Sequence, residues 1–144
     1  MAVRYFNNGT TNEGVTYLAA RGFLGAAAFA SWYIGLIDDA GFSTLAVTDR
    51  HISHPGWAEW TAMFGGTRVA WNPSPAAGQL LDAPNAVLSV TASGLVRGAF
   101  LASTPNIGSA SGQVIYAAGV DLTGMPVEPG GIVTVGYKLR LTPR

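Results

Sequence analysis

Glycine and proline divide this sequence into short apolar runs. There are 19 Gly and 8 Pro in 144 residues, and clusters such as Asn72-Pro73-Ser74-Pro75 and Glu128-Pro129-Gly130-Gly131 lie at the ends of these runs. Short runs bounded by such turn signals are typical of β-strands. Strands do not alternate with long helical segments, so the pattern predicts a mainly β fold, an antiparallel β-sandwich or jelly roll with one short N-terminal helix. A closed barrel is the alternative.

The expected strands follow from composition and alternation. Five runs are rich in β-branched, aromatic or small apolar residues: 32–37, 67–71, 86–92, 95–101 and 113–118. Ser93-Gly94, between two of them, predicts a two-residue hairpin. In the final run, 133–141, apolar residues alternate with Thr, Gly, Lys138 and Arg140. This period of two indicates a single strand with one buried and one exposed face.

One helix is expected, over residues 11–24. Thr10 and Glu13 have the spacing of a capping box, in which each side chain binds the other residue's backbone N–H. The apolar residues Val15, Leu18 and Phe23 follow at helical spacing. Residues 1–9 precede this helix as an N-terminal arm, and residues 10–144 are expected to form a single β-sandwich domain.

The segment 40–66 has no clear hydrophobic period. It contains Trp57, Trp60 and Phe64, which are expected to pack it against the rest of the domain. The segment is therefore interpreted as a long excursion between two strands.

Charge is scarce in this sequence. Lys and Arg number 8 and Asp and Glu number 8, so 11% of the residues are charged, against roughly 25% in ordinary domains. A net charge of +0 argues against nucleic-acid binding, which needs clustered positive charge. The longest apolar stretch, 23–37, is shorter than the roughly 20 residues of a membrane helix, and no secretory signal is visible. A neutral surface is typical of a chain that contacts other protein.

Few titratable groups are close together in the sequence. His51 and His54, with Asp49 or Glu59, have a spacing compatible with a metal site or a metal-dependent hydrolase. However, Pro55 follows at once and no helical pattern supports a shared face. The preferred interpretation is a turn in which His54 hydrogen-bonds the backbone. The sequence predicts no catalytic, cofactor-binding or metal-binding residue and no cofactor.

Other residues allow two interpretations. The four tryptophans are expected to be core residues, with a carbohydrate-binding platform as the alternative. Arg68 and Arg97 lie in apolar runs, where each is either a charge that protects a sheet edge or a contact to a partner. In the arm, Arg4, Tyr5 and Phe6 either reach a neighbouring molecule or cover the domain's own core.

Four motifs together resemble the cement or decoration proteins of tailed-bacteriophage heads, such as that of the Bordetella phage. They are Trp32-Tyr33-Ile34-Gly35-Leu36-Ile37-Asp38, His54-Pro55-Gly56-Trp57-Ala58-Glu59, Arg68-Val69-Ala70-Trp71 and Val96-Arg97-Gly98-Ala99-Phe100-Leu101. The resemblance spans most of the chain.

This resemblance implies a jelly-roll or sandwich fold, self-association as a homodimer, and binding to the major capsid protein on the outer surface of the virion. It implies no enzymatic activity and no cofactor. The alternative function is that of a tail-fibre or receptor-binding module that recognises a glycan. The candidate interface residues are Arg4, Tyr5, Phe6, Arg68, Arg97, Lys138 and Arg140.

Overall fold

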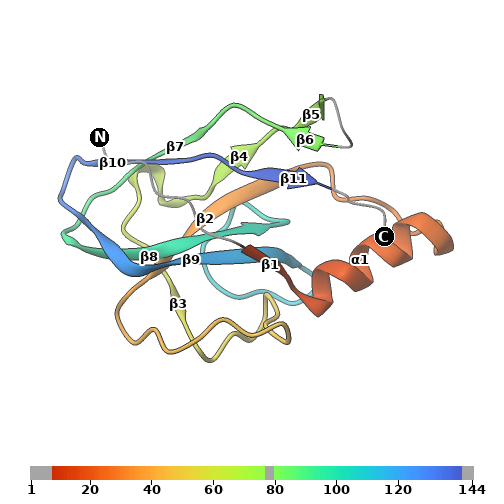
Figure 1. The fold of residues 1–144 in the computed structure, drawn as a ribbon, viewed down its shortest axis with the longest axis horizontal. Coiled ribbons are helices and arrows are strands. Elements are labelled where there is room, and N and C mark those ends of the chain that lie inside the picture. Colours follow the sequence, from red (N-terminus) through yellow and green to blue (C-terminus); the bar gives the residue numbers. More distant parts are fainter. Residues whose placement is uncertain (1–7, 77–79, 141–144) are drawn as a thin grey trace.

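The strands pair into a larger sheet and two smaller sheets, all antiparallel. The computed structural model describes residues 8–76 and 80–140. The larger sheet has the strand order β1 (Asn8–Thr10), β9 (Ile115–Val127), β8 (Gly94–Ala102), β2 (Trp32–Asp38) and β3 (Ala58–Glu59) (Figure 1). Strand β4 (Val69–Trp71) also pairs with β2. The smaller sheets are β10 (Ile132–Val135) with β7 (Ala86–Ser89), and β11 (Lys138–Arg140) with β6 (Leu80–Asp82) and β5 (Ser74–Ala76).

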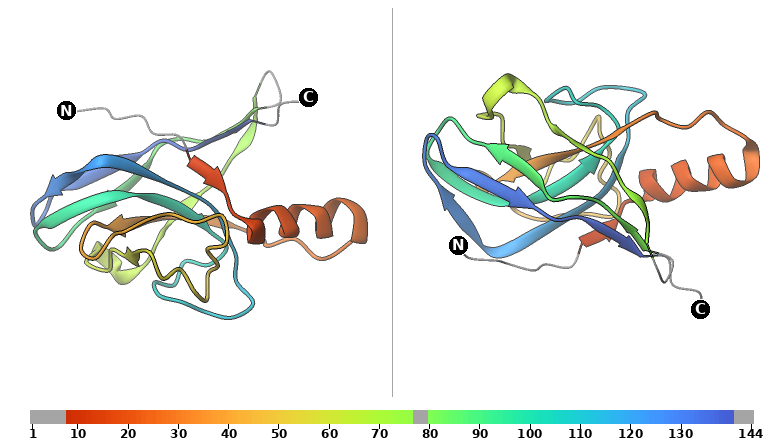
Figure 2. Two further views of the ribbon diagram at one scale, coloured as in Figure 1. Left: turned by 60° about the horizontal axis from the view of Figure 1, so that its bottom comes forward. Right: turned by 90° about the horizontal axis from the view of Figure 1, so that it is seen from above.

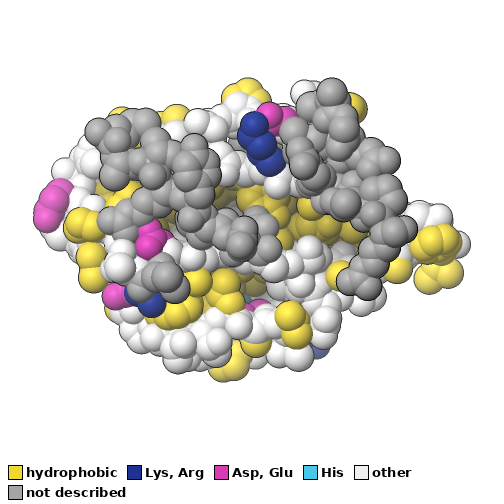
Figure 3. All heavy atoms as spheres, in the orientation of Figure 1, with side chains coloured by type: hydrophobic (Ala, Val, Ile, Leu, Met, Phe, Trp, Pro, Cys, Tyr) yellow, Lys and Arg dark blue, Asp and Glu magenta, His cyan; other side chains and the backbone are white. Residues whose placement is uncertain are grey.

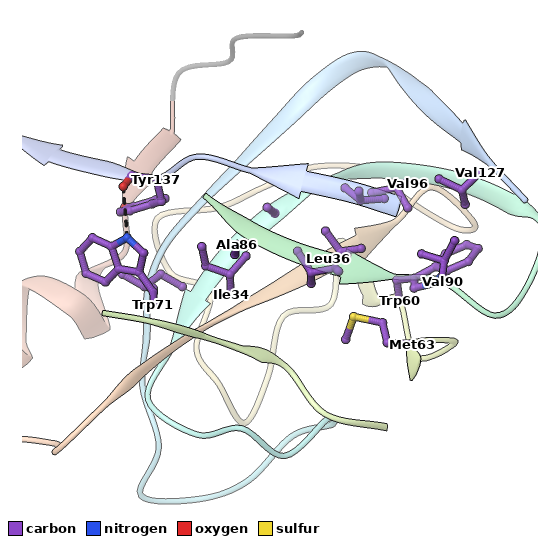
Figure 4. Packing of buried hydrophobic residues seen from close by; sticks show 14 of the residues in the cluster. Ile34, Leu36, Trp60, Met63, Trp71, Ala86, Val90, Val96, Val127 and Tyr137 are labelled. Carbon is purple, nitrogen blue, oxygen red and sulfur yellow. Dashed lines mark hydrogen bonds between the residues drawn. The ribbon is translucent and has the colours of Figure 1, made fainter. Parts of the chain in front are cut away.

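The main hydrophobic core lies between the larger sheet and the two smaller ones (Figure 4). Ile34 of β2, Leu88 of β7 and Val133 of β10 all belong to this core, and each is at most 4% exposed. The indole Nε1 of Trp71 donates a hydrogen bond of 3.1 Å to the carbonyl oxygen of Tyr137, which joins the two layers with a polar contact. Two layers of antiparallel sheet around one core confirm the mainly β sandwich with one helix. The jelly roll stays a prediction.

A second, smaller core lies on the other face of the larger sheet. Ile37 of β2 and Phe100 of β8 are buried there against Trp57 of the excursion between β2 and β4. The expectation that Trp57 and Trp60 anchor this segment is confirmed, since each is 5% exposed. The expectation for Phe64 is wrong, because this side chain is 80% exposed. It lies in the short 3₁₀ turn η1 (Phe64–Gly66), in which no residue is buried.

The predicted hairpin at Ser93-Gly94 is wrong. Strand β7 pairs with β10, whereas β8 pairs with β9 and β2, so the link at Ser93-Gly94 carries the chain from one layer to the other. The indole of Trp60 packs against Gly94, where a Cβ would lie 2.6 Å from the ring. Gly94 is already the first residue of β8, and the core residues on the two sides of this link belong to different sheets.

The last predicted strand is divided at Gly136. Strand β10 pairs with β7 and β11 pairs with β6, so one alternating run serves two sheets. A Cβ at Gly136 would lie 2.8 Å from the side chain of Asn85, which explains the small residue at the break. The alternation itself is confirmed, because Val133 and Tyr137 are buried and Lys138 is exposed.

Helix α1 (Asn12–Leu24) matches the expected helix, but its capping differs. The N-cap is Thr11, whose Oγ1 accepts the Gly14 N–H at 2.9 Å. Glu13 does not close a capping box: its Oε2 accepts the backbone N–H groups of His51 and Ile115, both at 2.9 Å. Glu13 is one residue too close to this N-cap for the box. Within the described residues, no helix is long and apolar enough to cross a membrane.

The N-terminal arm joins the sheet earlier than expected. In β1, Asn8 pairs with Gly119 and Gly9 with Ala118 of β9. The expected arm, residues 1–9, is therefore part of the larger sheet from Asn8 onward. Arg4, Tyr5 and Phe6 lie outside the described residues.

Candidate functional site

Among the described residues, one ion pair is almost fully buried. Nε and Nη2 of Arg68 donate to the two carboxylate oxygens of Glu59 at 2.7 and 2.8 Å, and the side chains are 2% and 6% exposed. Arg68 also donates to the carbonyl oxygens of Thr104 and Gly108, at 3.0 and 3.2 Å. The expectation of Arg68 as an edge charge or partner contact is therefore wrong. Its guanidinium is enclosed and its hydrogen-bonding groups are used inside the domain.

His51 extends this cluster. Its Nε2 lies 3.1 Å from Nη1 of Arg68, and its Nδ1 lies 3.2 Å from the carbonyl oxygen of Ala110. A guanidinium can only donate, so Nε2 must be the acceptor in this contact, and Nδ1 also lies 3.0 Å from the backbone nitrogen of Ala110. Burial, and then the positive charge of Arg68, lower the pKa of His51 from its ordinary value. The ring is therefore held neutral.

The side chains considered for a metal site do not converge. Nδ1 of His54 contacts the carbonyl oxygen of Trp57 at 2.9 Å, and its ring stacks on that indole with centroids 3.9 Å apart. This confirms the turn interpretation of His54. Glu59 is occupied by Arg68, and no group of three or more His, Cys, Asp or Glu suited to a metal occurs among the residues described. The cluster joins the excursion to the loop 104–110.

Arg97 and Lys138, the two remaining candidate interface residues whose side chains the structure describes, lie in different layers. Nη1 of Arg97 on β8 lies 3.1 Å from Oδ1 of Asp39, and the arginine side chain is 22% exposed. Nζ of Lys138 on β11 lies 2.9 Å from Oδ2 of Asp82, in the other layer. The side chain of Arg140 lies outside the part that the structure describes. Both described cations are thus engaged in separate ion pairs.

Three of the four tryptophans are core residues. Trp57, Trp60 and Trp71 are 4–5% exposed, so they are not available as a platform for a glycan. Trp32 is half-buried and makes an edge contact with Tyr17 of α1 at a centroid distance of 5.1 Å. The core interpretation is confirmed for the three buried rings.

Helix α1 turns its apolar side away from the domain. We call this side the outward face of α1; its residues are Val15, Leu18, Ala19, Gly22 and Phe23, and Leu24 is exposed next to it at the C-terminal end of the helix. The helix projects from the sheets (Figure 2), and hydrophobic side chains are exposed at its far end (Figure 3). Phe23 is 89% and Leu24 81% exposed. None of these residues is charged.

The contacts of α1 explain this orientation. Gly14 packs so closely on β9 that a Cβ would lie 2.4 Å from the carbonyl oxygen of Tyr116. On the same side of the helix, Tyr17 stacks on Phe29 at 5.2 Å, within the segment that returns to β2. Gly25, with a φ of 63°, ends the helix in the left-handed conformation that glycine favours. The helix is thus held by its aromatic side.

The sequence contained a partial signal for the outward face. The helical spacing of its apolar residues identified the stripe, but a helix normally turns such a stripe toward its own core. In this structure the stripe is exposed instead, with Val15 55%, Leu18 41% and Phe23 89% exposed. Comparison of the chain with protein-family models, with curated proteins and with solved structures found no match.

Proposed function

We propose that this chain is a structural virion protein, a capsid cement protein that binds the outer surface of the major capsid protein shell and stabilises it. The observation that carries the proposal is the outward face of α1, an uncharged apolar surface on a projecting element. The resemblance of the four sequence motifs to phage cement proteins supports the same function. The proposal includes self-association as a homodimer and involves no enzymatic step.

The size of the outward face is suited to a small contact that many copies of the protein make on one shell. Exposed apolar patches of a few hundred Å² on a monomer often mark interaction sites. A stable pairwise interface needs about 800 Å² from each partner, more than one 13-residue helix supplies from a single side. On a shell, many copies of a modest contact act together, and the effective concentration of each neighbour strengthens the binding.

The charge distribution is compatible with this function. Figure 3 shows few charged side chains among the described residues of the face in view, and basic side chains there lie next to acidic ones. Such a surface avoids the repulsion that like charges on adjacent copies would cause. The binding of the protein to the capsid should therefore depend little on salt concentration.

The test uses purified protein and expanded capsids that lack it. The protein should bind these capsids and raise their melting temperature, because a ligand that binds only the native state stabilises it by mass action. The informative variant is Phe23→Ser with Leu24→Ser, which removes two exposed apolar side chains without touching the core. Binding should weaken at least about tenfold, as expected when roughly 1.4 kcal/mol is lost.

The chain offers a matched control. Phe64 is 80% exposed on the 3₁₀ turn η1, so Phe64→Ser removes a similar exposed ring from another surface. This variant should bind as the unmodified protein does. Capsids whose heat stability is unchanged by the added protein would contradict the proposed function. Equal binding by both variants would reject the outward face of α1 as its carrier. Sedimentation of the free protein tests the homodimer separately.

A further inference from the structure

A groove runs along the inner side of α1, opposite its outward face. It has a volume of about 660 Å³ and lies between the helix and the segments around residues 48–50 and 112–114. Tyr17, Phe29 and Val114 supply apolar walls, and Arg21 and Arg50 supply two positive charges. We call this the α1 groove. It is separate from the buried Arg68 cluster, whose arginine and histidine do not line it.

Two nitrogens of the Arg21 guanidinium group have no hydrogen-bond partner among the residues that the structure describes. These are Nε and Nη1, and both are buried. The guanidinium carbon lies 4.4 Å from the ring centroid of Tyr17 and 5.8 Å from that of Phe29. Cation–π contacts favour the charge but leave N–H donors unused. A buried donor without an acceptor costs about 1–3 kcal/mol, so an acceptor that reached this guanidinium would be bound favourably.

The second cation of the groove is only weakly compensated. Nε of Arg50 lies 3.6 Å from Oε1 of Glu13, and the arginine side chain is 66% exposed. The other oxygen of Glu13 already accepts two backbone N–H groups. The α1 groove therefore has two guanidinium groups and one carboxylate, which leaves an excess of one positive charge in a chain with a net charge of +0.

We propose that the α1 groove binds a segment of a partner protein that presents a carboxylate next to an apolar side chain. The carboxylate accepts hydrogen bonds from Arg21 and lies within reach of Arg50, and the apolar neighbour packs on the walls at Tyr17 and Val114. The planar guanidinium matches the two oxygens of a carboxylate. Apolar walls favour a protein segment over a free, fully hydrated anion such as phosphate.

This inference does not depend on the proposed function, because it can be tested on the isolated protein. The probe is the peptide N-acetyl-Leu-Asp-Leu-amide, titrated into ¹⁵N-labelled protein and followed by the Nε–H resonance of Arg21 and the amide of Gly112. We expect saturable shifts of both signals. The matched peptide with Asn in place of Asp should bind at least about tenfold more weakly, because hydrogen bonds to charged groups are stronger than neutral ones.

Three variants complete the test. Arg21→Met keeps an apolar stem without donors and should abolish the response at Gly112, while Arg50→Met, at an exposed position, should weaken it several-fold. Lys138→Met removes the same charge from an exposed site on β11 and should leave binding unchanged. Equal binding of the Asp and Asn peptides, or unchanged binding by both groove variants, would overturn the inference. So would inorganic phosphate that shifts Arg21 as strongly and displaces the peptide, since the site would then be one for free anions.

Discussion

Replacing Glu59 with glutamine should destabilise the protein strongly, because Arg68 would remain buried without its counter-charge. The amide of glutamine would place N–H donors against the guanidinium, which itself can only donate. Removing one partner of a buried ion pair costs about 3–5 kcal/mol. A domain is stable by about 5–15 kcal/mol in total, so the Glu59→Gln protein should be close to the limit of folding.

The assay is a double-mutant cycle with Glu59→Gln, Arg68→Met and the combined variant, followed by denaturant unfolding. Each single substitution should lower the melting temperature by about 6–20 °C, at 2–4 °C for each kcal/mol in a chain of this size. The combined variant should be far more stable than the sum of the single effects predicts. Its recovery will be incomplete, because the carbonyl oxygens of Thr104 and Gly108 lose their Arg68 donors.

The exposed pair of Lys138 and Asp82 is the internal control. Its side chains are 63% and 34% exposed, and a cycle with Lys138→Met and Asp82→Asn should give a coupling energy of at most about 1 kcal/mol. For Arg68 and Glu59 the coupling should exceed about 2 kcal/mol. Additive effects at the buried pair would refute the reasoning, because they would mean that the two charges are independently solvated.

Three further predictions rest on single residues. Burial lowers the pKa of His51 in the folded protein, so as the pH falls the unfolded chain binds this proton first. The free energy of unfolding should therefore decrease below about pH 6.5, by up to about 1.4 kcal/mol per pH unit. Unfolding experiments at about pH 5.5 and 7.5 should show that His51→Gln removes this dependence. Gly14→Ala should lower the melting temperature, because its Cβ would lie 2.4 Å from a backbone oxygen, whereas Gly22→Ala, with no atom within 4 Å, should raise stability by about 0.5–1 kcal/mol. In calorimetry, Trp57→Ala should cost about 3–5 kcal/mol, and Phe64→Ala less than about 0.5 kcal/mol.

Alternation along a strand could be predicted from the sequence, but strand partners could not. Val133 and Tyr137 were expected to be buried and Lys138 exposed, and all three are. The break at Gly136 was missed, because a strand that passes from one partner to another keeps its period of two. At Ser93-Gly94 the predicted hairpin was wrong, since a link between two layers contains the same residue types as a turn within one sheet.

The buried ion pair was missed for a similar reason. Arg68 lies beside an apolar run, where a sequence gives no sign of whether an arginine points outward or inward. Glu59 is nine residues away and meets Arg68 only because the excursion folds back on the larger sheet. An acid and a base at such a separation form no local pattern. The direction of the outward face of α1 was hidden in the same way, because it is set by contacts of Tyr17 with residues beyond the helix.

The composition understates how neutral the exterior of this protein is. Arg68 and Glu59 are enclosed, and Asp49 is 4% exposed, with Oδ2 accepting the indole N–H of Trp57. Some of the few charged side chains therefore lie in the interior, and the surface carries fewer charges than the composition suggests. A chain that placed charge only for solubility would do the reverse, with charge outside and the apolar stripe of α1 inside. Charge inside and apolar residues outside lower the solubility of an isolated protein and suit a surface that another protein covers. For this reason the proposed function depends on the outward face of α1 and not on the buried cluster.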